Sequence, residues 1–517
     1  MAEQIIERVA LNFTDLTGKK TGCTTLGSNK FWVGMVVKND DGTFDYRCQW
    51  GSTGTEGKTT GSKYDVGEDK AHKLLAAKVK SKKKKGYTEL QTRSKDEETA
   101  KAAAQGVDLT SGKKAKPKKV KAVASRQFHQ QVDRLLGIIY GKCSATVRSG
   151  LSNTAGATED NPIGNLSDSQ LDTGGGILDE IQKLLGRKLG NESRSNKDTE
   201  LPLLRSGVPS ETIIDLTNEF MSNVPREIDR KKRGKKNLHS IVISSYARLE
   251  DQRKFLQLLR DAHLSQATFQ AAAAQKSSGS KAAVWYDGLD CGIEYLESGS
   301  KDRKWAEQVF NTAQSRQNAN WFRNGRCVLR VKNVWRFSRK GTEARFDAYA
   351  AKMKAKRGAL GNIFAWHGTG DANLLGISKS GLLMPENLPR GIHISGKAFG
   401  KGIYHAPVVN TVPMIEGHRT DGTNGALKSM NYTSAQGAYY GSSNTSKGAF
   451  MYLQEVSLGR GDVYTSPCWD RHRPRNWPKN DYIYANAGGC SSLSHDELVT
   501  FDEDAQMFRY LLEIEVC

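Results

Sequence analysis

The chain of 517 residues lacks several features that define other classes of protein. No apolar run reaches the 18 or more residues that a membrane-spanning helix needs, and the opening MAEQIIERVALNF has no signal-peptide core. The eight cysteines are never closer than 22 residues, so the sequence contains neither a CxxC zinc motif nor a dense disulfide framework. We therefore expect a protein of a reducing compartment, with no membrane partner and no structural metal.

Acidic residues are also outnumbered by basic residues. There are 77 Lys and Arg against 56 Asp and Glu, a formal net charge of +21, and residues 78–124 alone hold 15 basic and 5 acidic side chains. Such an excess favours polyanions such as nucleic acid, because phosphate contacts release counterions. A lysine run is equally typical of a solvated helix and linker. Lys78 to Lys85 and Lys113 to Lys121 therefore either contact phosphates or supply only non-specific attraction.

The length predicts two to four domains. Residues 1–107 contain two strand-like runs, KFWVGMVVKND and TFDYRCQWG, then the helical EDKAHKLLAAKVKSKKKK, which indicates a small α+β domain. Residues 108–124 are poor in large apolar side chains and predict a flexible basic linker. Its KKAKPKKVK also resembles a nuclear import signal.

Residues 125–275 predict an all-α domain. In SDSQLDTGGGILDEIQKLLG we expect Ser167 to cap a helix together with Gln170, and Gly186 to end it. Two further helices are predicted in SETIIDLTNEFMSNV and SSYARLEDQRKFLQLLRDAHL. The first helix has one apolar face, formed by Ile177, Leu178, Ile181, Leu184 and Leu185.

Residues 281–517 change to strand-like runs, RCVLRVKNVWRF, FMYLQEVSLG and RYLLEIEV, separated by loops rich in Gly and Asn. This alternation of strand-like runs and loops predicts a mainly antiparallel sheet domain with a few helices. The tract AAAAQKSSGSKAA at residues 271–283 marks the expected boundary. The fold class expected for the whole chain is multidomain α+β.

The motif HGTGDANLLG resembles a dinucleotide fingerprint in part. Asn373 stands where the third glycine should be, and the surrounding sequence does not alternate strands with helices. A nicotinamide oxidoreductase of the Rossmann type is therefore disfavoured.

Residues further along the chain suit a nicotinamide. Tyr404 follows a glycine turn in FGKGIYHAP, Ser429 precedes Tyr432 by three residues in KSMNY, and Glu497 lies in SHDELVTFD. Two aromatic rings can flank a flat heteroaromatic ring, and a hydroxyl can bind a carboxamide. A glutamate can orient a ribose 2′-hydroxyl and stabilise the positive charge that develops as a glycosidic bond breaks.

FAWHG, FGKGIY, KSMNY and DELVTFD, the last followed by YLLEIEV, resemble in order the signature segments of the poly(ADP-ribose) polymerase catalytic domain, with its histidine, tyrosine, glutamate triad. The resemblance implies a split antiparallel β-sheet ADP-ribosyltransferase domain that consumes NAD+ as substrate and uses no metal. It implies that Glu497 is the catalytic residue. The residues that it implies bind NAD+ are His367, Gly368, Thr369, Tyr404, Ser429 and Tyr432.

The resemblance extends upstream. NPIGNLSDSQLDTGGGILDEIQKLL and IIDLTNEFMSNVPREI resemble the family's helical regulatory domain, which restrains access to the NAD+ site until DNA damage releases it. FDYRCQWGSTG resembles the WGR domain, which grips DNA ends. The resemblance therefore implies that Trp50 and Gly51 bind DNA, although a tryptophan in a small β domain is also typical of a core.

The sequence departs from the family at four places. Ser52 replaces the arginine of WGR, Gly370 stands where close relatives have arginine, and His405 stands where they have an aromatic ring. About twenty extra residues between Tyr404 and KSMNY can alter the rim of the acceptor site.

We expect a DNA-break-stimulated poly(ADP-ribosyl)transferase that modifies itself and other proteins in the DNA damage response. It would be nuclear in a eukaryotic host and otherwise cytoplasmic. Glu497 argues that polymers are possible, because its replacement generally confines family members to single transfers. The alternative is a DNA-end-binding scaffold that adds single ADP-ribose units or none, and Ser52 keeps it open.

Overall fold

The structure is a computed structural model, and it describes sixteen stretches of the chain. These are residues 4–16, 28–53, 57–90, 126–151, 157, 162–164, 166–189, 209–226, 241–275, 277–312, 329–385, 387–388, 399–408, 449–464, 480–485 and 496–516. The chain forms two compact units, one containing Met1–Ala122 and Ser144–Ala274, the other Val123–Cys143, Gln275–Leu388 and Ile394–Cys517. None of the described helices has the length and apolar character needed to cross a membrane.

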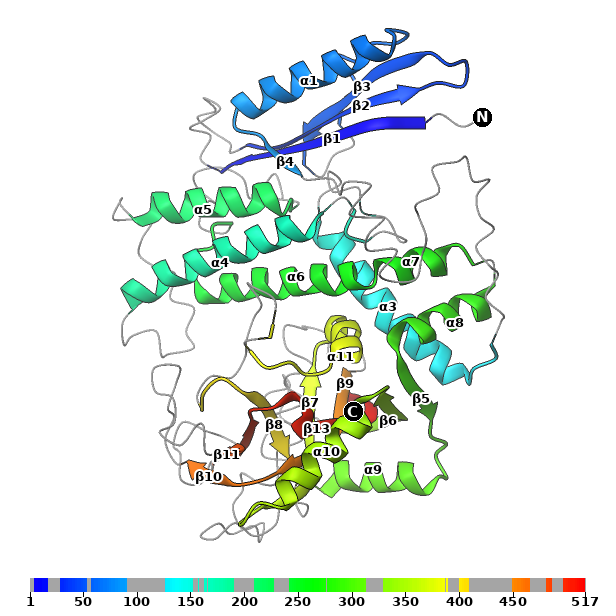
Figure 1. The fold of residues 1–517 in the computed structure, drawn as a ribbon, viewed down its shortest axis with the longest axis vertical. Helices are drawn as coiled ribbons and strands as arrows, with labels where there is room; N and C mark the ends of the chain where they lie inside the picture. Colours follow the sequence, from blue (N-terminus) through cyan, green and yellow to red (C-terminus); the bar gives the residue numbers. More distant parts are fainter. Residues whose placement is uncertain are drawn as a thin grey trace. The chain divides into compact units, whose positions relative to one another are not determined.

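The first unit begins with a small antiparallel sheet of order β3-β2-β1-β4, which one helix covers (Figure 1). Its elements are β1 (Gln4–Asp15), β2 (Ser28–Lys38), β3 (Phe44–Ser52), α1 (Glu68–Lys84) and β4 (Thr88–Leu90). The two predicted strands and the predicted lysine-rich helix are thereby confirmed.

Helix α1 sits close to this sheet because one strand position has no side chain. Ala71 and Leu75 of α1 pack with Trp32 in the core of this sheet and helix. A Cβ atom on Gly34 would lie 2.3 Å from the Trp32 ring and 2.5 Å from Leu75. Only glycine therefore fits at this position of β2.

The rest of the first unit is helical. Its helices are α4 (Asp168–Leu189), α5 (Pro209–Asn223), α6 (Tyr246–Leu264), α7 (Gln266–Ala273) and the end of α3 (Gln130–Gly150). Helix α4 packs against α5 and α6. The Ser167 hydroxyl accepts from the Gln170 backbone N–H at 3.3 Å, and Gln170 Oε1 accepts from the Ser167 N–H at 3.1 Å, which confirms the predicted cap.

The prediction that Gly186 ends this helix is wrong, because α4 continues to Leu189. A glycine inside a helix costs only about 1 kcal/mol relative to alanine, and Arg187, Lys188 and Leu189 are good helix formers.

Strand β1 is bound to α5 within the first unit through polar contacts. The Asn12 side-chain N–H donates to the Met221 carbonyl, and the Leu16 backbone N–H donates to Asn218 Oδ1, each at 3.0 Å. Asn12 is fully buried, so its amide is satisfied only by such partners.

The second unit contains a nine-stranded sheet of order β10-β11-β12-β8-β7-β9-β13-β6-β5, antiparallel except for the β10–β11 pair. The strands are β5 (Cys291–Tyr295), β6 (Leu329–Arg339), β7 (Gly361–Thr369), β8 (Ile403–Pro407), β9 (Ala449–Leu458), β10 (Gly461–Tyr464), β11 (Tyr482–Ala485), β12 (Glu497–Thr500) and β13 (Gln506–Val516). The helices are the start of α3, α8 (Ser278–Leu289), α9 (Lys301–Thr312), α10 (Thr342–Lys354), α11 (Leu374–Ser380) and the short η7 (Asp371–Asn373) and η9 (Glu503–Ala505).

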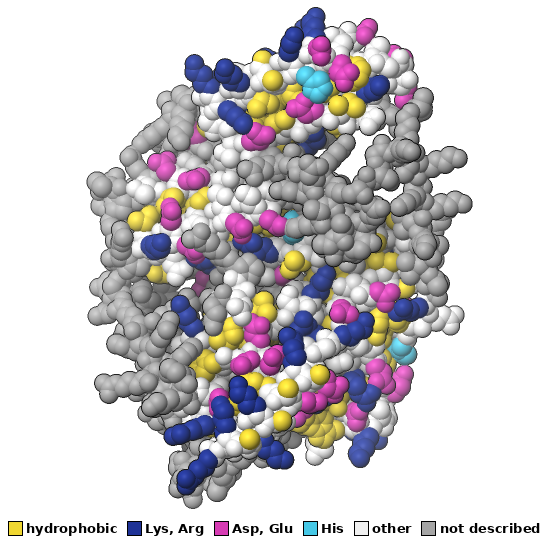
Figure 2. Space-filling view, in the orientation of Figure 1, with side chains coloured by type: hydrophobic (Ala, Val, Ile, Leu, Met, Phe, Trp, Pro, Cys, Tyr) yellow, Lys and Arg dark blue, Asp and Glu magenta, His cyan; other side chains and the backbone are white. Residues whose placement is uncertain are grey.

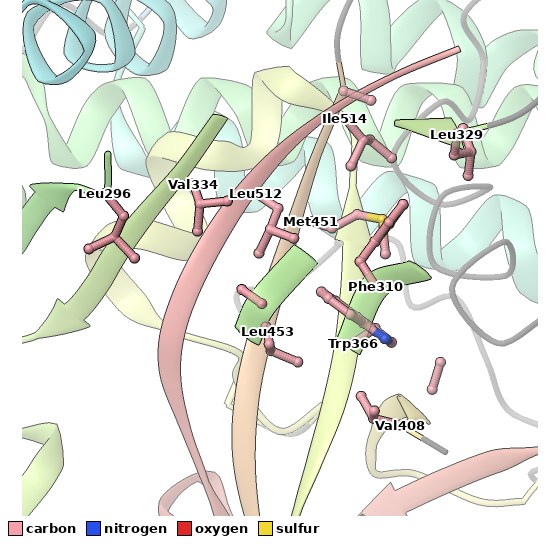
Figure 3. Packing of buried hydrophobic residues seen from close by; sticks show 13 residues of the cluster. Leu296, Phe310, Leu329, Val334, Trp366, Val408, Met451, Leu453, Leu512 and Ile514 are labelled. Atoms are coloured by element: carbon pink, nitrogen blue, oxygen red, sulfur yellow. The ribbon is translucent and has the colours of Figure 1, made fainter. Parts of the chain in front are cut away.

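Helix α9 buries its apolar side against the middle strands of this sheet (Figure 3). The Phe310 ring meets the Trp366 ring edge-on, with centroids 5.8 Å apart, and Met451, Leu453 and Leu512 surround them. Burying such side chains stabilises the fold by about 1.5–3 kcal/mol each. The expected multidomain α+β class, with a mainly antiparallel sheet in the last part of the chain, is confirmed.

Candidate active site

Three neighbouring strands carry the predicted triad. His367 lies near the end of β7, Tyr404 lies in β8, and Glu497 begins β12, and these strands are adjacent in the order β12-β8-β7. Val499 pairs with Tyr404, and Trp366 pairs with Ala406. Residues separated by up to 130 positions in the sequence are therefore brought to one part of the sheet.

Strand β7 separates from β8 where the predicted NAD+ residues begin. Its residues pair with β9 along their whole length up to Thr369, whereas pairs with β8 occur only at Ala365 and Trp366 among the described residues. Among the described residues, a strand partner therefore lies on one side only, that of β9, for the last three residues of β7, His367, Gly368 and Thr369. Backbone groups on an unpaired strand edge can bind a ligand's amide.

His367 is half-buried, and its environment keeps it neutral. The pKa of His367 is lowered to about 4, because burial outweighs the opposing effect of a hydrogen bond to the backbone of Tyr404. At neutral pH the ring has one N–H and one free acceptor nitrogen, the set needed to bond both a carbonyl and a hydroxyl.

The Tyr404 ring is held by its own hydroxyl. The Phe399 backbone N–H donates to Tyr404 Oη, and Oη donates to the Gly400 carbonyl, each at 2.9 Å. The ring packs with Phe399, Ile483 and Val499. These contacts fix the ring orientation before any ligand binds.

Thr369 is buried, and its hydroxyl accepts a hydrogen bond at 3.2 Å from the side chain of Asn373. In the sequence, Asn373 was notable only as a missing glycine. Its spacing of four residues from Thr369, across a strand end and a 3-10 turn, was the available signal that both belong to one site.

Glu497 is a partly buried carboxyl. Desolvation raises its pKa from 4.5 to about 7. A carboxyl with a pKa near neutrality can act both as a hydrogen-bond acceptor and in proton transfer. The next residue toward the N-terminus, Asp496, is bound separately, because it accepts a hydrogen bond from the Tyr484 hydroxyl at 2.7 Å.

His405 is a polar residue that the sequence marked only as a departure from the family. It is almost fully buried, and its ring contacts Thr500 and Gln454. Burial, together with the nearby His367, lowers the pKa of His405 to about 3. The predicted residues Ser429 and Tyr432 lie outside the described residues.

The predicted DNA-binding residues Trp50 and Gly51 lie at the end of β3 in the first unit. Trp50 pairs across the strands with Trp32, but Trp32 is covered while Trp50 remains 38% exposed. The indole N–H of Trp50 donates to the Thr60 carbonyl at 3.0 Å, which holds the ring in place. The interpretation of Trp50 as a core residue is therefore wrong.

Basic side chains are visible over α1 on the face drawn in Figure 2. Lys82 lies over the Tyr87 ring at 4.9 Å, and Lys83 pairs with Glu89. Ser52, in the position of the WGR arginine, ends β3 next to Gly51.

Comparison with known proteins supplies three domain matches in chain order. Residues 7–94 match the WGR domain, residues 127–286 the poly(ADP-ribose) polymerase regulatory domain, and residues 307–411 the poly(ADP-ribose) polymerase catalytic domain. The chain belongs to the poly(ADP-ribose) polymerase family. The catalytic match includes His367 and Tyr404 and ends before Glu497.

Two curated plant proteins of this family are similar to the chain. Poly [ADP-ribose] polymerase 1 of Arabidopsis thaliana is 26% identical over 251 residues, which are 48% of this chain and 21% of that protein. Poly [ADP-ribose] polymerase 1 of Oryza sativa subsp. japonica is 23% identical over 413 residues, 78% of this chain and 36% of that protein. The chain thus spans about a fifth to a third of the length of these relatives.

Proposed function

We propose that the chain is an NAD+ ADP-ribosyltransferase that builds poly(ADP-ribose), with Glu497 as its catalytic residue. The observation that carries this proposal is the placing of His367, Tyr404 and Glu497 on three adjacent strands of one sheet, with His367 and Tyr404 inside the match to the poly(ADP-ribose) polymerase catalytic domain. The raised pKa of Glu497 supports a role in proton transfer.

The described residues suit the parts of NAD+. His367 would bond a hydroxyl of the adenosine ribose, with Thr369 beside it. The unpaired edge of β7 at Gly368 would bond the carboxamide, and Tyr404 would line the nicotinamide. Ser429 and Tyr432 would complete the nicotinamide site, as the family resemblance implies.

In the proposed reaction the bond between nicotinamide N1 and ribose C1″ breaks, and its electron pair leaves with nicotinamide. An acceptor oxygen then bonds to C1″ and loses its proton. Glu497 would hold the ribose 2″-hydroxyl, stabilise the positive charge on the ribose, and take up the acceptor's proton. A neutral His367 suits this scheme, because a second positive charge would oppose the developing one.

The proposed partners are DNA strand breaks and protein acceptors, including the chain itself. The exposed Trp50 and the basic α1 support DNA binding, because aromatic stacking and phosphate contacts need no particular base sequence. In a eukaryotic cell we place the protein in the nucleus and in the DNA damage response. The domain limits proposed are 1–107, 108–124, 125–275 and 281–517.

Release of nicotinamide from NAD+, measured with and without nicked duplex DNA, tests the proposal. We expect turnover that rises with nicked DNA and loses this stimulation as salt increases. Turnover that does not respond to DNA would refute the proposed regulation by DNA but would still support the proposed transferase activity. No turnover at all would favour the second candidate, a DNA-end-binding scaffold, to which Ser52 in place of arginine lends support.

A further inference from the structure

Four buried polar side chains form a continuous chain of hydrogen bonds that includes residues of two triad strands, β8 and β12. We call Gln454, His405, Thr500 and Gln506 the relay. Gln454 Nε2 lies 2.6 Å from His405 Nδ1, and His405 Nε2 lies 2.9 Å from Thr500 Oγ1. Thr500 Oγ1 lies 3.1 Å from Gln506 Oε1, and Gln506 Nε2 donates to the Glu503 carbonyl at 2.8 Å.

The direction of every bond in the relay follows from its last member. Because Gln506 Nε2 donates to a carbonyl, its Oε1 is an acceptor and the Thr500 hydroxyl donates to it. Thr500 Oγ1 therefore accepts from His405 Nε2–H, which leaves His405 Nδ1 to accept from Gln454. His405 is thus a neutral ring with one defined tautomer, and a second proton would face an amide N–H.

The relay joins strands that are not all neighbours. His405 in β8 contacts β12 directly, but it reaches Gln454 in β9 across the intervening strand β7. The β7 residue paired with Gln454 is Ala365, whose methyl group leaves room for the two longer side chains. Burial makes such a network rigid, because breaking one bond strands a buried polar group. Gln454 Oε1 is the one atom of the relay that is buried without a hydrogen-bond partner among the described residues.

Two residues of the relay belong to strands that carry triad residues. His405 follows Tyr404 in β8 and pairs with Leu498, and Leu498 follows Glu497 in β12. Thr500 ends the same four-residue strand that Glu497 begins. β12 is only four residues long, with four pairs to β11 and three to β8, so a side-chain bond at its end adds a further restraint on its position.

We infer that the relay through His405 is a positioning device, which holds β12 against β8 so that the Glu497 carboxyl stays in register with Tyr404. His405 does not touch the reacting atoms in this scheme and acts through the strand. The catalytic part of this inference rests on the proposed function. The strand-holding part rests on geometry alone.

The test compares variants that break the relay with one that breaks an unrelated buried bond. His405→Phe removes both ring bonds at similar size, and Thr500→Val removes the hydroxyl if the first variant folds poorly. His405→Gln restores a donor toward Thr500, and Thr500→Ser restores the hydroxyl. Ser378→Ala is the control, because it removes a buried bond of 3.0 Å to Tyr452 in the same unit, away from β12.

Two readouts separate the inference from the proposed function. Amide hydrogen exchange of residues 497–500 should become at least about tenfold faster in His405→Phe and Thr500→Val, and stay unchanged in Ser378→Ala. With NAD+ turnover, kcat should fall about 10–100-fold while KM for NAD+ changes less than about threefold, since misplacement affects the transition state. The Gln and Ser variants should recover much of both losses.

Unchanged exchange in β12 would overturn the inference whatever the activity. Faster exchange with unchanged kcat in an active protein would overturn the catalytic half and leave His405 structural. Faster exchange in a chain that never consumes NAD+ would refute the proposed function while the strand-holding half stands.

Discussion

The small N-terminal sheet and the nine-stranded sheet place their candidate functional side chains in different environments. Trp50 in the first is 38% exposed, whereas Glu497 in the second is partly buried. A binding ring on the outside contributes little to the core. The partly buried carboxyl of Glu497, the proposed catalytic residue, carries a desolvation cost, seen in its raised pKa. The proposed binding ring is thus compatible with stability in one sheet, whereas the proposed catalytic carboxyl opposes stability in the other.

Glu497→Gln is expected to have the largest effect, because it removes the charge of the proposed catalytic carboxyl on β12 and keeps the side chain's size. We expect NAD+ turnover to fall by about 100-fold or more, with NAD+ binding retained. Nicotinamide release and a gel of products from labelled NAD+ measure the loss, and calorimetry measures binding. Polymer formed at the wild-type rate would show that Glu497 is not the catalytic residue.

Trp50→Ala tests the role of the exposed ring in the small N-terminal sheet. We expect affinity for nicked DNA to fall about 5–150-fold, because stacking of one base on an aromatic ring is worth about 1–3 kcal/mol. The thermal midpoint should hardly change, since the ring is exposed. Fluorescence anisotropy with a labelled nicked duplex gives the affinity, and Trp50→Phe, which keeps a ring, should lose less. A large drop in midpoint with unchanged affinity would make Trp50 structural.

The buried carboxyl should also make the stability of the second unit depend on pH. Between pH 4.5 and about 7 the folded state keeps a proton on Glu497 that the unfolded chain has lost, so stability falls as pH rises through this window. The expected change is about 1–3 kcal/mol. Midpoints for wild type and Glu497→Gln, measured across this range, should converge at low pH and favour the variant near pH 8. Parallel curves would contradict the shifted pKa.

The smallest predicted effect compares two glycines. Among the described residues, no atom outside the α3 backbone lies within 4 Å of the place that a Cβ on Gly141 would take, so Gly141→Ala should stabilise by about 0.5–1 kcal/mol. Gly34→Ala in the N-terminal sheet should destabilise by about 1–3 kcal/mol, because its methyl would meet Trp32 and Leu75. Urea unfolding measures both, and two changes of the same sign would contradict this account.

Local patterns predicted much of the secondary structure. The strands around residues 30–50, the lysine-rich helix and the Ser167 cap with Gln170 all depend on neighbours in the sequence. The prediction that Gly186 ends its helix was wrong, because the cost of one glycine is smaller than the gain from continuing the helix. The order of the motifs also identified the family, which three domain matches confirm.

The relay could not be predicted from the sequence. Gln454, His405, Thr500 and Gln506 carry no common motif, and their contacts depend on which strands are neighbours. The sequence showed His405 only as a histidine where relatives have an aromatic ring. Its role as a link between β9 and β12 depends on Ala365 lying between them.

The sequence by itself determined the family, the kinds of domain and the identity of His367, Tyr404 and Glu497 as candidates, because motifs are local and ordered. Tertiary structure alone decided that these residues share adjacent strands, that Trp50 is exposed while Trp32 is covered, and that Glu497 titrates near neutrality. Strand pairing and burial are non-local, and the electrostatic cost of burying a charge depends on every group that excludes water from it.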